Sequence, residues 1–273
     1  MSPHLVSQSS KRRSSFGPAV RLSILVSLAV VATSCSNAAP SEVPPASPAT
    51  PSVTGIAAPL PPAQEVTILG VQGLALRGTW RAAAAPSSPA LLLLHMYGGG
   101  REDWAPEAET MQQAGFSSLA LDLRGQGDTG GEENWTLAIE DVAAAQAWIA
   151  SQPDVDSRRR GTIGASIGAN LALTHAALDP EIRAVALLSP GLNYFGVSLE
   201  GLMSSYGARP ILLAASDKDA YSADTAQVLA GEASGQVDLL IYPGSAHGTE
   251  LLYRTHGDFL PELMRFLQES LAP

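Results

Sequence analysis

The amino-acid sequence predicts an α/β domain built on a mostly parallel β-sheet of about eight strands, with helices on both faces. Short apolar runs alternate with longer amphipathic stretches along most of the chain. The run at 90–95 is apolar up to a final histidine, which is typical of a strand buried on both faces. Alternation of the two kinds of segment favours parallel strands joined by crossover helices.

Each expected strand is followed by a turn or by a helical stretch. The strands are expected at 65–69, 74–80, 90–95, 117–122, 161–164, 184–189, 210–215 and 237–242. The helices are expected at 106–114, 135–151, 167–177, 222–230 and 251–267. In sheets of this kind functional groups gather in loops at the carboxyl ends of the strands, so the candidate site is expected there.

Residues 1–34 have the features of an export signal. The segment contains basic residues and no acidic residue. Its apolar run at 22–32 is shorter than the roughly twenty helical residues that cross a bilayer. We therefore expect a signal peptide rather than a membrane-spanning anchor.

The end of this signal, Ala32-Thr33-Ser34-Cys35, resembles a bacterial lipobox, in which the cysteine becomes lipidated and then N-terminal. Ala32 departs from the leucine that is usual at its position. The resemblance implies an exported protein of the bacterial cell envelope, attached to a membrane by a lipid on Cys35. The alternative is ordinary secretion after cleavage near Ala32 or Ala39.

Residues 35–63 are expected to be a linker and residues 64–273 the folded domain. The linker is rich in Ala, Pro and Ser and has scarcely a charge, so it cannot build a core. Such a segment favours extended, solvated conformers and would act as a spacer between a membrane and the domain.

The composition excludes some partners. The formal net charge is −10, which argues against nucleic acid because phosphate binding needs clustered Lys and Arg. An acidic surface is typical of a soluble protein. The chain has one cysteine, Cys35, so it cannot form an internal disulfide.

Gly164-Ala165-Ser166-Ile167-Gly168 lies where an expected strand ends and an expected helix begins. A tight strand-to-helix turn presents a serine hydroxyl above a sheet, and glycines on either side relieve backbone crowding. The pattern alone is weak, since a glycine-rich turn with a serine helix cap would look the same. Its position between strand and helix predicts that Ser166 is a nucleophile.

A serine hydroxyl needs a base to take its proton and an acid to orient that base. His247 lies in a loop of small residues after the last expected strand and is the expected base. Asp219 follows the expected strand at 210–215 and is the expected acid, with Asp217 as the competitor. Either aspartate could instead cap the helix expected from Ser222.

The chain order Ser166, Asp219, His247 is the order found on the α/β-hydrolase sheet. On these residues the domain, from about residue 65 to the end, resembles an α/β hydrolase of the dienelactone-hydrolase-like and small serine esterase branch. The resemblance implies hydrolysis of ester or related acyl bonds through an acyl-enzyme, with no metal or organic cofactor. Dienelactone hydrolases use cysteine as the nucleophile, so Ser166 favours an ester over a dienelactone.

Two further segments carry the resemblance. Leu94-His95-Met96-Tyr97-Gly98-Gly99 resembles the family's oxyanion loop, which implies backbone N–H donors at Tyr97 and Ile167. Met96 stands where the family has glycine and is the alternative donor. Residues 121–127 resemble the Asp-x-Arg-Gly-x-Gly loop of the family, which implies a structural role for Arg124.

About twenty residues separate the strands expected at 184–189 and 210–215, which is too few for a large helical lid. An open cleft favours esters of small to medium size. The aromatic residues Tyr97, Trp104, Tyr194 and Phe195 could line such a cleft or belong to the core. Two other functions stay open: a cell-surface binding protein on a retired hydrolase fold, and a peptidase or thioesterase of the same fold.

Overall fold

The computed structural model describes residues 59–255 and 257–273. The expected export signal, Cys35 and nearly all of the expected linker lie outside the described residues. The first strand begins at Gln64. No helix in the described part of the chain is both long enough and apolar enough to cross a membrane.

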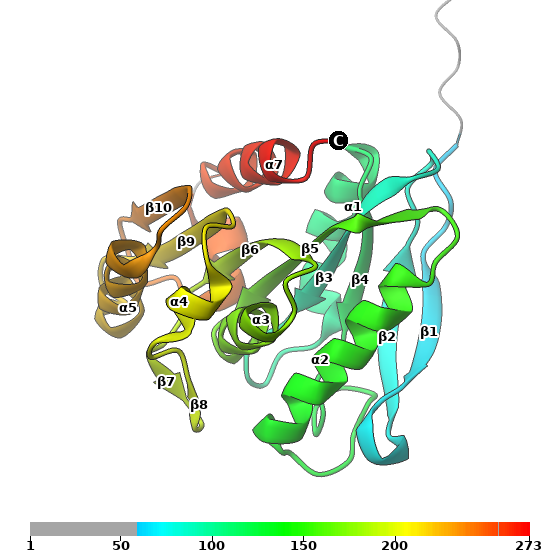
Figure 1. Ribbon diagram of the computed structural model, residues 1–273, viewed down its shortest axis with the longest axis horizontal. Helices are drawn as coiled ribbons and strands as arrows, with labels where there is room; N and C mark the ends of the chain where they lie inside the picture. The colour runs from blue at the N-terminus through cyan, green and yellow to red at the C-terminus, as the bar shows by residue number, and fades with distance from the viewer. Residues whose placement is uncertain (1–58, 256) are drawn as a thin grey trace, which may run out of the picture. The chain divides into compact units, whose positions relative to one another are not determined.

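A sheet of eight strands forms the middle layer of the domain, in the order β1-β2-β4-β3-β5-β6-β9-β10 (Figure 1). The β1–β2 and β2–β4 pairs are antiparallel and all the other pairs in this sheet are parallel. The predicted α/β fold with a mostly parallel sheet is therefore confirmed. The strands are β1 (Gln64–Leu69), β2 (Ala75–Arg81), β3 (Ser88–Leu94), β4 (Ser117–Leu121), β5 (Val155–Ala165), β6 (Ile182–Leu188), β9 (Ile211–Ser216) and β10 (Val237–Tyr242).

Helices cover both faces of this sheet and bury two apolar cores (Figure 1). Successive residues of β3 alternate between them because side chains of a strand point to opposite faces. Leu92 packs with residues of α2 and α3, whereas Leu91 packs with residues of α1 and α7. The principal helices are α1 (Ala105–Gln113), α2 (Trp135–Ala150), α3 (Ile167–Leu178), α5 (Ala220–Glu232) and α7 (Phe259–Ser270).

The structure differs from the sequence prediction in two of the expected elements. The strand expected at 161–164 is longer and begins at Val155. The sequence did not predict its first half, because that half is polar and lacks the apolar signal of a buried strand. The helix expected at 251–267 is divided into α6 (Leu251–Arg254) and α7, with Gly257 at a positive φ of 84° between them. Glycine adopts this conformation without steric penalty, so Gly257 lets the chain turn before α7 begins at Phe259.

Short elements that the sequence did not predict lie in four connections. The β6–β9 connection forms a hairpin of β7 (Asn193–Tyr194) and β8 (Val197–Ser198), followed by α4 (Leu202–Tyr206), and contains no large lid. The single-turn 3-10 helices are η1 (Val71–Gly73), η2 (Arg101–Trp104) and η3 (Gly248–Glu250).

A buried ion pair links the loop after β4 to α2. Arg124 Nε donates to Asp141 Oδ2 at 2.7 Å, and Arg124 Nη2 donates to Asp141 Oδ1 at 2.9 Å. The Val71 N–H also donates to Asp141 Oδ1, at 2.8 Å, so the β1–β2 connection joins the same cluster. These contacts support the structural role expected for Arg124.

Replacing Asp141 by alanine leaves the Arg124 guanidinium buried without its partner. We expect Asp141→Ala to lower the free energy of unfolding by about 3–5 kcal/mol, as when one member of a buried ion pair is removed. Urea unfolding followed by circular dichroism measures the change. Glu140→Ala, at the exposed neighbouring position of α2, is the matched control. Equal losses in the two variants would contradict the structural role of the pair.

Candidate active site

Ser166 lies in a strained turn between β5 and α3. Its backbone has a φ of 53° and a ψ of −118°, a combination that residues with a side chain rarely adopt. The Ser166 N–H donates to Leu188 O at the end of β6, at 2.8 Å, which fixes the turn to the neighbouring strand. The turn is thus the strand-to-helix geometry that the sequence predicted for the nucleophile.

Close backbone approaches explain the two glycines of this turn. A Cβ at Gly164 would lie 2.1 Å from Gly168 O. A Cβ at Gly168 would lie 2.5 Å from Leu94 O and 2.6 Å from His95 O. Each distance is shorter than any normal contact, so a side chain at either position would force the backbone apart. The same approach brings the first turn of α3 against the end of β3.

His247 lies beside Ser166, at the end of the loop that follows β10. Its Nε2 is 2.8 Å from Ser166 Oγ, and its Nδ1 is 2.7 Å from Asp219 Oδ2. Two backbone contacts fix the loop, since the Gly248 N–H donates to Ser189 Oγ at 3.0 Å and the His247 N–H to Glu250 Oε2 at 3.1 Å. The structure therefore brings Ser166, His247 and Asp219 into one hydrogen-bonded series.

The two candidate acids have different partners. Asp217 Oδ1 accepts from the Gly244 N–H at 2.8 Å, so its carboxylate supports the loop that carries His247. Asp219 occupies the N-cap position of α5, yet its side chain makes no capping hydrogen bond. Its carboxylate is instead directed to the imidazole of His247.

His95 fixes the loop expected to supply an oxyanion donor. The ring is fully buried, and burial lowers its pKa, so it stays neutral at physiological pH. The Leu123 N–H donates to Nε2 at 3.0 Å, which leaves Nδ1 as the N–H that donates to Met96 O at 2.8 Å. His95 thereby joins the loop after β3 to the loop after β4.

The two expected oxyanion donors stand next to the strained turn. Ile167 is the first residue of α3, where a backbone N–H has no partner within the helix. Tyr97 belongs to the loop that begins at His95. The carbonyl oxygen of His95 lies close to Gly168 in the first turn of α3. The side chain of Met96 packs against Gly248. A Cβ built on Gly248 would lie only 2.9 Å from the Met96 sulfur. The larger residue at position 96 thus fills space beside His247.

The β7–β8 hairpin brings Tyr194, one of the aromatic residues expected either to line the cleft or to belong to the core, against His247. The ring of Tyr194 meets the His247 ring edge to face, with centroids 6.3 Å apart. Its hydroxyl lies 3.1 Å from Ser222 Oγ. Burial raises the pKa of Tyr194, hydrogen bonding to Ser222 opposes the rise, and the nearby Asp219 charge adds to it. The phenol therefore stays protonated beside the histidine.

The structure decides between core and surface for the other aromatic candidates. Trp104 is completely buried and belongs to the core beneath α1. Tyr97 and Phe195 are exposed and stand close together, with centroids 5.1 Å apart. Trp135, which the sequence did not single out, stacks on Phe195. The position of Trp135 at the start of α2 does not predict that it stacks on Phe195.

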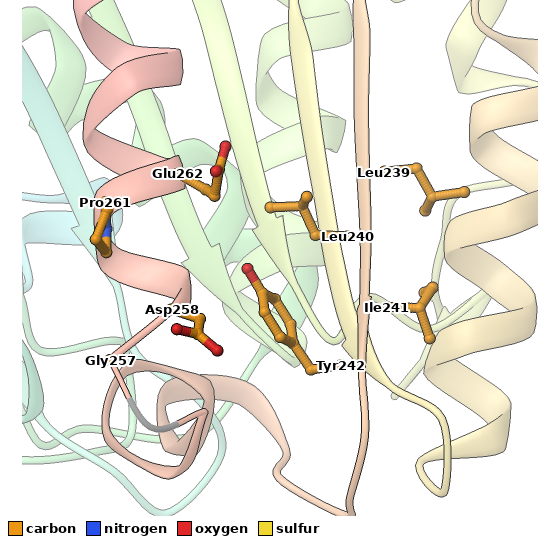
Figure 2. A pocket seen from close by; sticks show the side chains of 8 residues that line it. All are labelled: Leu239, Leu240, Ile241, Tyr242, Gly257, Asp258, Pro261 and Glu262. Carbon is orange, nitrogen blue, oxygen red and sulfur yellow. The ribbon is translucent and has the colours of Figure 1, made fainter.

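A hollow of about 710 Å³ lies between β10 and α7, and its lining side chains are drawn in Figure 2. The side chains of Leu240 and Tyr242 point toward α7, whereas Leu239 and Ile241 point toward α5. Burial raises the pKa of Tyr242, and the nearby charges of Glu262 and Asp258 add to the effect. Among the described residues, its lining consists of Leu239, Leu240, Ile241, Tyr242, Gly257, Asp258, Pro261 and Glu262.

Residues 59–255 and 257–273 contain no group of three or more His, Cys, Asp or Glu side chains placed to hold a metal ion.

Comparison with known proteins agrees with the fold. The profile of a family described as alpha/beta hydrolase fold matches residues 89–204. An uncharacterized protein of Mycobacterium tuberculosis (strain ATCC 25618 / H37Rv) is 27% identical over 230 residues, which are 77% of this chain and 81% of that protein.

Two solved structures show the same architecture at low sequence identity. An esterase of Pyrococcus furiosus superposes with a TM-score of 0.67 at 19% identity, covering 77% of this chain and 91% of that one. A dienelactone hydrolase of Anabaena variabilis ATCC 29413 gives a TM-score of 0.62 at 21% identity, covering 77% and 99%. The domain therefore has the α/β-hydrolase fold.

Proposed function

We propose that the protein is a serine hydrolase that cleaves carboxylic esters of small to medium size through an acyl-enzyme. The observation that carries the proposal is the series from Asp219 through His247 to Ser166, with contacts of 2.7 and 2.8 Å. All three residues follow the carboxyl ends of parallel strands, where α/β sheets hold their ligands. The esterase and the dienelactone hydrolase among the structural neighbours support the same class of reaction.

In the first half of the reaction, Ser166 Oγ attacks the carbonyl carbon of the ester while His247 Nε2 takes the hydroxyl proton. Asp219 accepts a hydrogen bond from Nδ1–H and stabilises the imidazolium that forms. The bond between the carbonyl carbon and the alcohol oxygen then breaks. The alcohol leaves with the proton that His247 returns to it, and the acyl group stays on Ser166.

Water completes the cycle. The oxygen of a water molecule attacks the acyl carbon while His247 takes one of the water's protons. The bond between the acyl carbon and Ser166 Oγ then breaks. Ser166 recovers its proton from His247, and the acid product leaves. The N–H groups of Tyr97 and Ile167 are proposed to hold the oxyanion in both steps, where one such donor contributes about 3 kcal/mol.

The direct test is hydrolysis of p-nitrophenyl acetate and butyrate by wild type and Ser166→Ala. We expect the variant to lose at least about three orders of magnitude in kcat, because its nucleophile is gone. Ser204→Ala, which removes an exposed hydroxyl on α4, is the matched control and should behave as wild type.

The same assay separates the competing functions. If wild type and Ser166→Ala were equally slow across ester, thioester and amide substrates, the hydrolase proposal would be lost in favour of a binding protein. A clear preference for thioesters or amides would change the proposed acyl bond, while Ser166 would keep its role.

Paired substitutions test which aspartate orients the base. Asp219→Asn is expected to lower kcat by about four orders of magnitude, because the amide no longer stabilises the imidazolium. Asp217→Asn should have a much smaller effect, since its Oδ1 still accepts the Gly244 N–H. Steady-state rates of the two variants on one ester provide the comparison. A greater loss at Asp217 would reverse the assignment.

We also propose that residues 1–34 direct export, that Cys35 carries the lipid, and that residues 35–63 separate the domain from a membrane of the cell envelope. The lipobox-like sequence supports this proposal. Mass spectrometry of the mature protein should find Cys35 at the N-terminus with an added diacylglycerol. Cys35→Ser should move the protein from the membrane fraction to the soluble fraction. An unlipidated mature chain without Cys35 would remove this proposal and indicate ordinary secretion.

A further inference from the structure

Three aromatic rings from separate segments meet one another, and one of them, Phe195, directly follows Tyr194, whose ring contacts His247. Tyr97 comes from the loop after β3, Trp135 from the first turn of α2, and Phe195 from the turn of the β7–β8 hairpin. Phe195 lies 5.1 Å from Tyr97 and 5.3 Å from Trp135 between ring centroids, and its plane is inclined by only 22° to that of Trp135. We call these three residues the aromatic wall.

The wall presents aromatic surface to solvent. Trp135 is 9% exposed and forms its buried base, whereas Tyr97 and Phe195 are each 54% exposed. Large apolar side chains that gather at a protein surface, rather than standing singly, mark a contact site for a ligand or partner. Aromatic side chains also commonly line small-molecule sites.

The backbone at Phe195 is strained. Phe195 and Gly196 have φ values of 51° and 86°, and they form the two-residue turn between β7 and β8. Turns with two positive φ values favour Asn-Gly, because asparagine tolerates this conformation better than larger residues. An aromatic residue here costs about 1–3 kcal/mol, and strain of this kind persists mainly at functional sites.

The hairpin is held firmly in place next to the nucleophile. Asn170, in the first turns of α3, donates to Gly191 O and to Val197 O, both at 2.8 Å, and accepts from the Gly191 N–H at 3.2 Å. From α5, Tyr221 Oη accepts from the Asn193 N–H at 2.9 Å. These contacts place Tyr194 against the ring of His247 and put its neighbour Phe195 in the wall.

We infer that the site is selective for esters that carry a flat aromatic group, which stacks on the exposed faces of Tyr97 and Phe195. The inference rests on the proposed ester hydrolysis and names its substrate class. Aromatic rings stack with an energy beyond that of simple apolar burial, so a planar ring should be favoured over a saturated ring of equal carbon number. The ring can belong to the alcohol or to the acyl part of the ester.

Matched substrate pairs test the selectivity of the full-length enzyme. Benzyl acetate against cyclohexylmethyl acetate probes the alcohol part, and methyl 3-phenylpropanoate against methyl 3-cyclohexylpropanoate probes the acyl part. Wild type is expected to show a kcat/KM about tenfold higher for the aromatic member of at least one pair. Ethyl acetate, which carries no ring, reports the reaction itself.

Phe195→Asn removes the ring and at the same time provides a better turn residue. We expect this variant to keep or raise Tm, to lose most of the aromatic preference, and to lose less on ethyl acetate than on the aromatic ester. Phe195→Tyr, which restores a ring, should restore the preference. Leu178→Asn is the control for loss of an exposed apolar side chain, since Leu178 is 74% exposed at the far end of α3, about 18 Å from its start.

The possible outcomes separate the two proposals. If wild type cleaves ethyl acetate but shows no aromatic preference in either pair, the aromatic inference is wrong and ester hydrolysis stands. If Phe195→Asn lowered kcat/KM equally for all esters and left the preference for aromatic over saturated rings unchanged, the aromatic inference would also be wrong. The hairpin would then serve only to position Tyr194. If wild type cleaves none of these esters, both proposals fall.

Discussion

The close approach of the first turn of α3 to the end of β3 is the constraint on which the candidate site depends. At Gly168 the backbone leaves no room for a side chain, since a Cβ would lie 2.5 Å from Leu94 O. This approach brings the first turn of α3, which begins at Ile167, against the loop that begins at His95. In the same turn Ser166 has a φ of 53°, and its hydroxyl contacts the His247 ring. The strain is balanced by the packing of a wholly buried helix face.

Single hydrogen bonds join the loops around this turn to one another, and those to His95 and Ser189 are buried. The Leu123 N–H donates to His95, the Gly248 N–H to Ser189, and the Gly244 N–H to Asp217. Each of these side chains accepts from the backbone of a different loop. Burial lowers the pKa of His95, which keeps Nε2 free to accept. Such supporting contacts hold a catalytic constellation in its working geometry before a substrate arrives.

The parts of the molecule that could be predicted from the sequence carry a local signal. Apolar runs such as 90–95 reveal buried strands, and the turn at Ser166 is recognisable from glycines that its backbone requires. The β7–β8 hairpin could not be predicted, because strands of two residues have no periodicity. Trp104 and Trp135 are both buried in the apolar cores, and the sequence could not show that only Trp135 also stacks on Phe195, because that contact depends on tertiary packing. Asp217 and Asp219 follow the same strand, and only their contacts distinguish them.

The β7–β8 hairpin connects His247 to the aromatic wall through two adjacent residues. Tyr194 meets the base, and Phe195, at the turn, meets Tyr97 and Trp135. Asn170 holds this hairpin from α3, the helix that begins directly after Ser166. Movement of the hairpin would therefore disturb the base and the aromatic wall together. Because α3 begins directly after Ser166 and also holds the hairpin, under the proposed function the distance between a reacting carbonyl and a stacked ring would be set by the packing of this one helix.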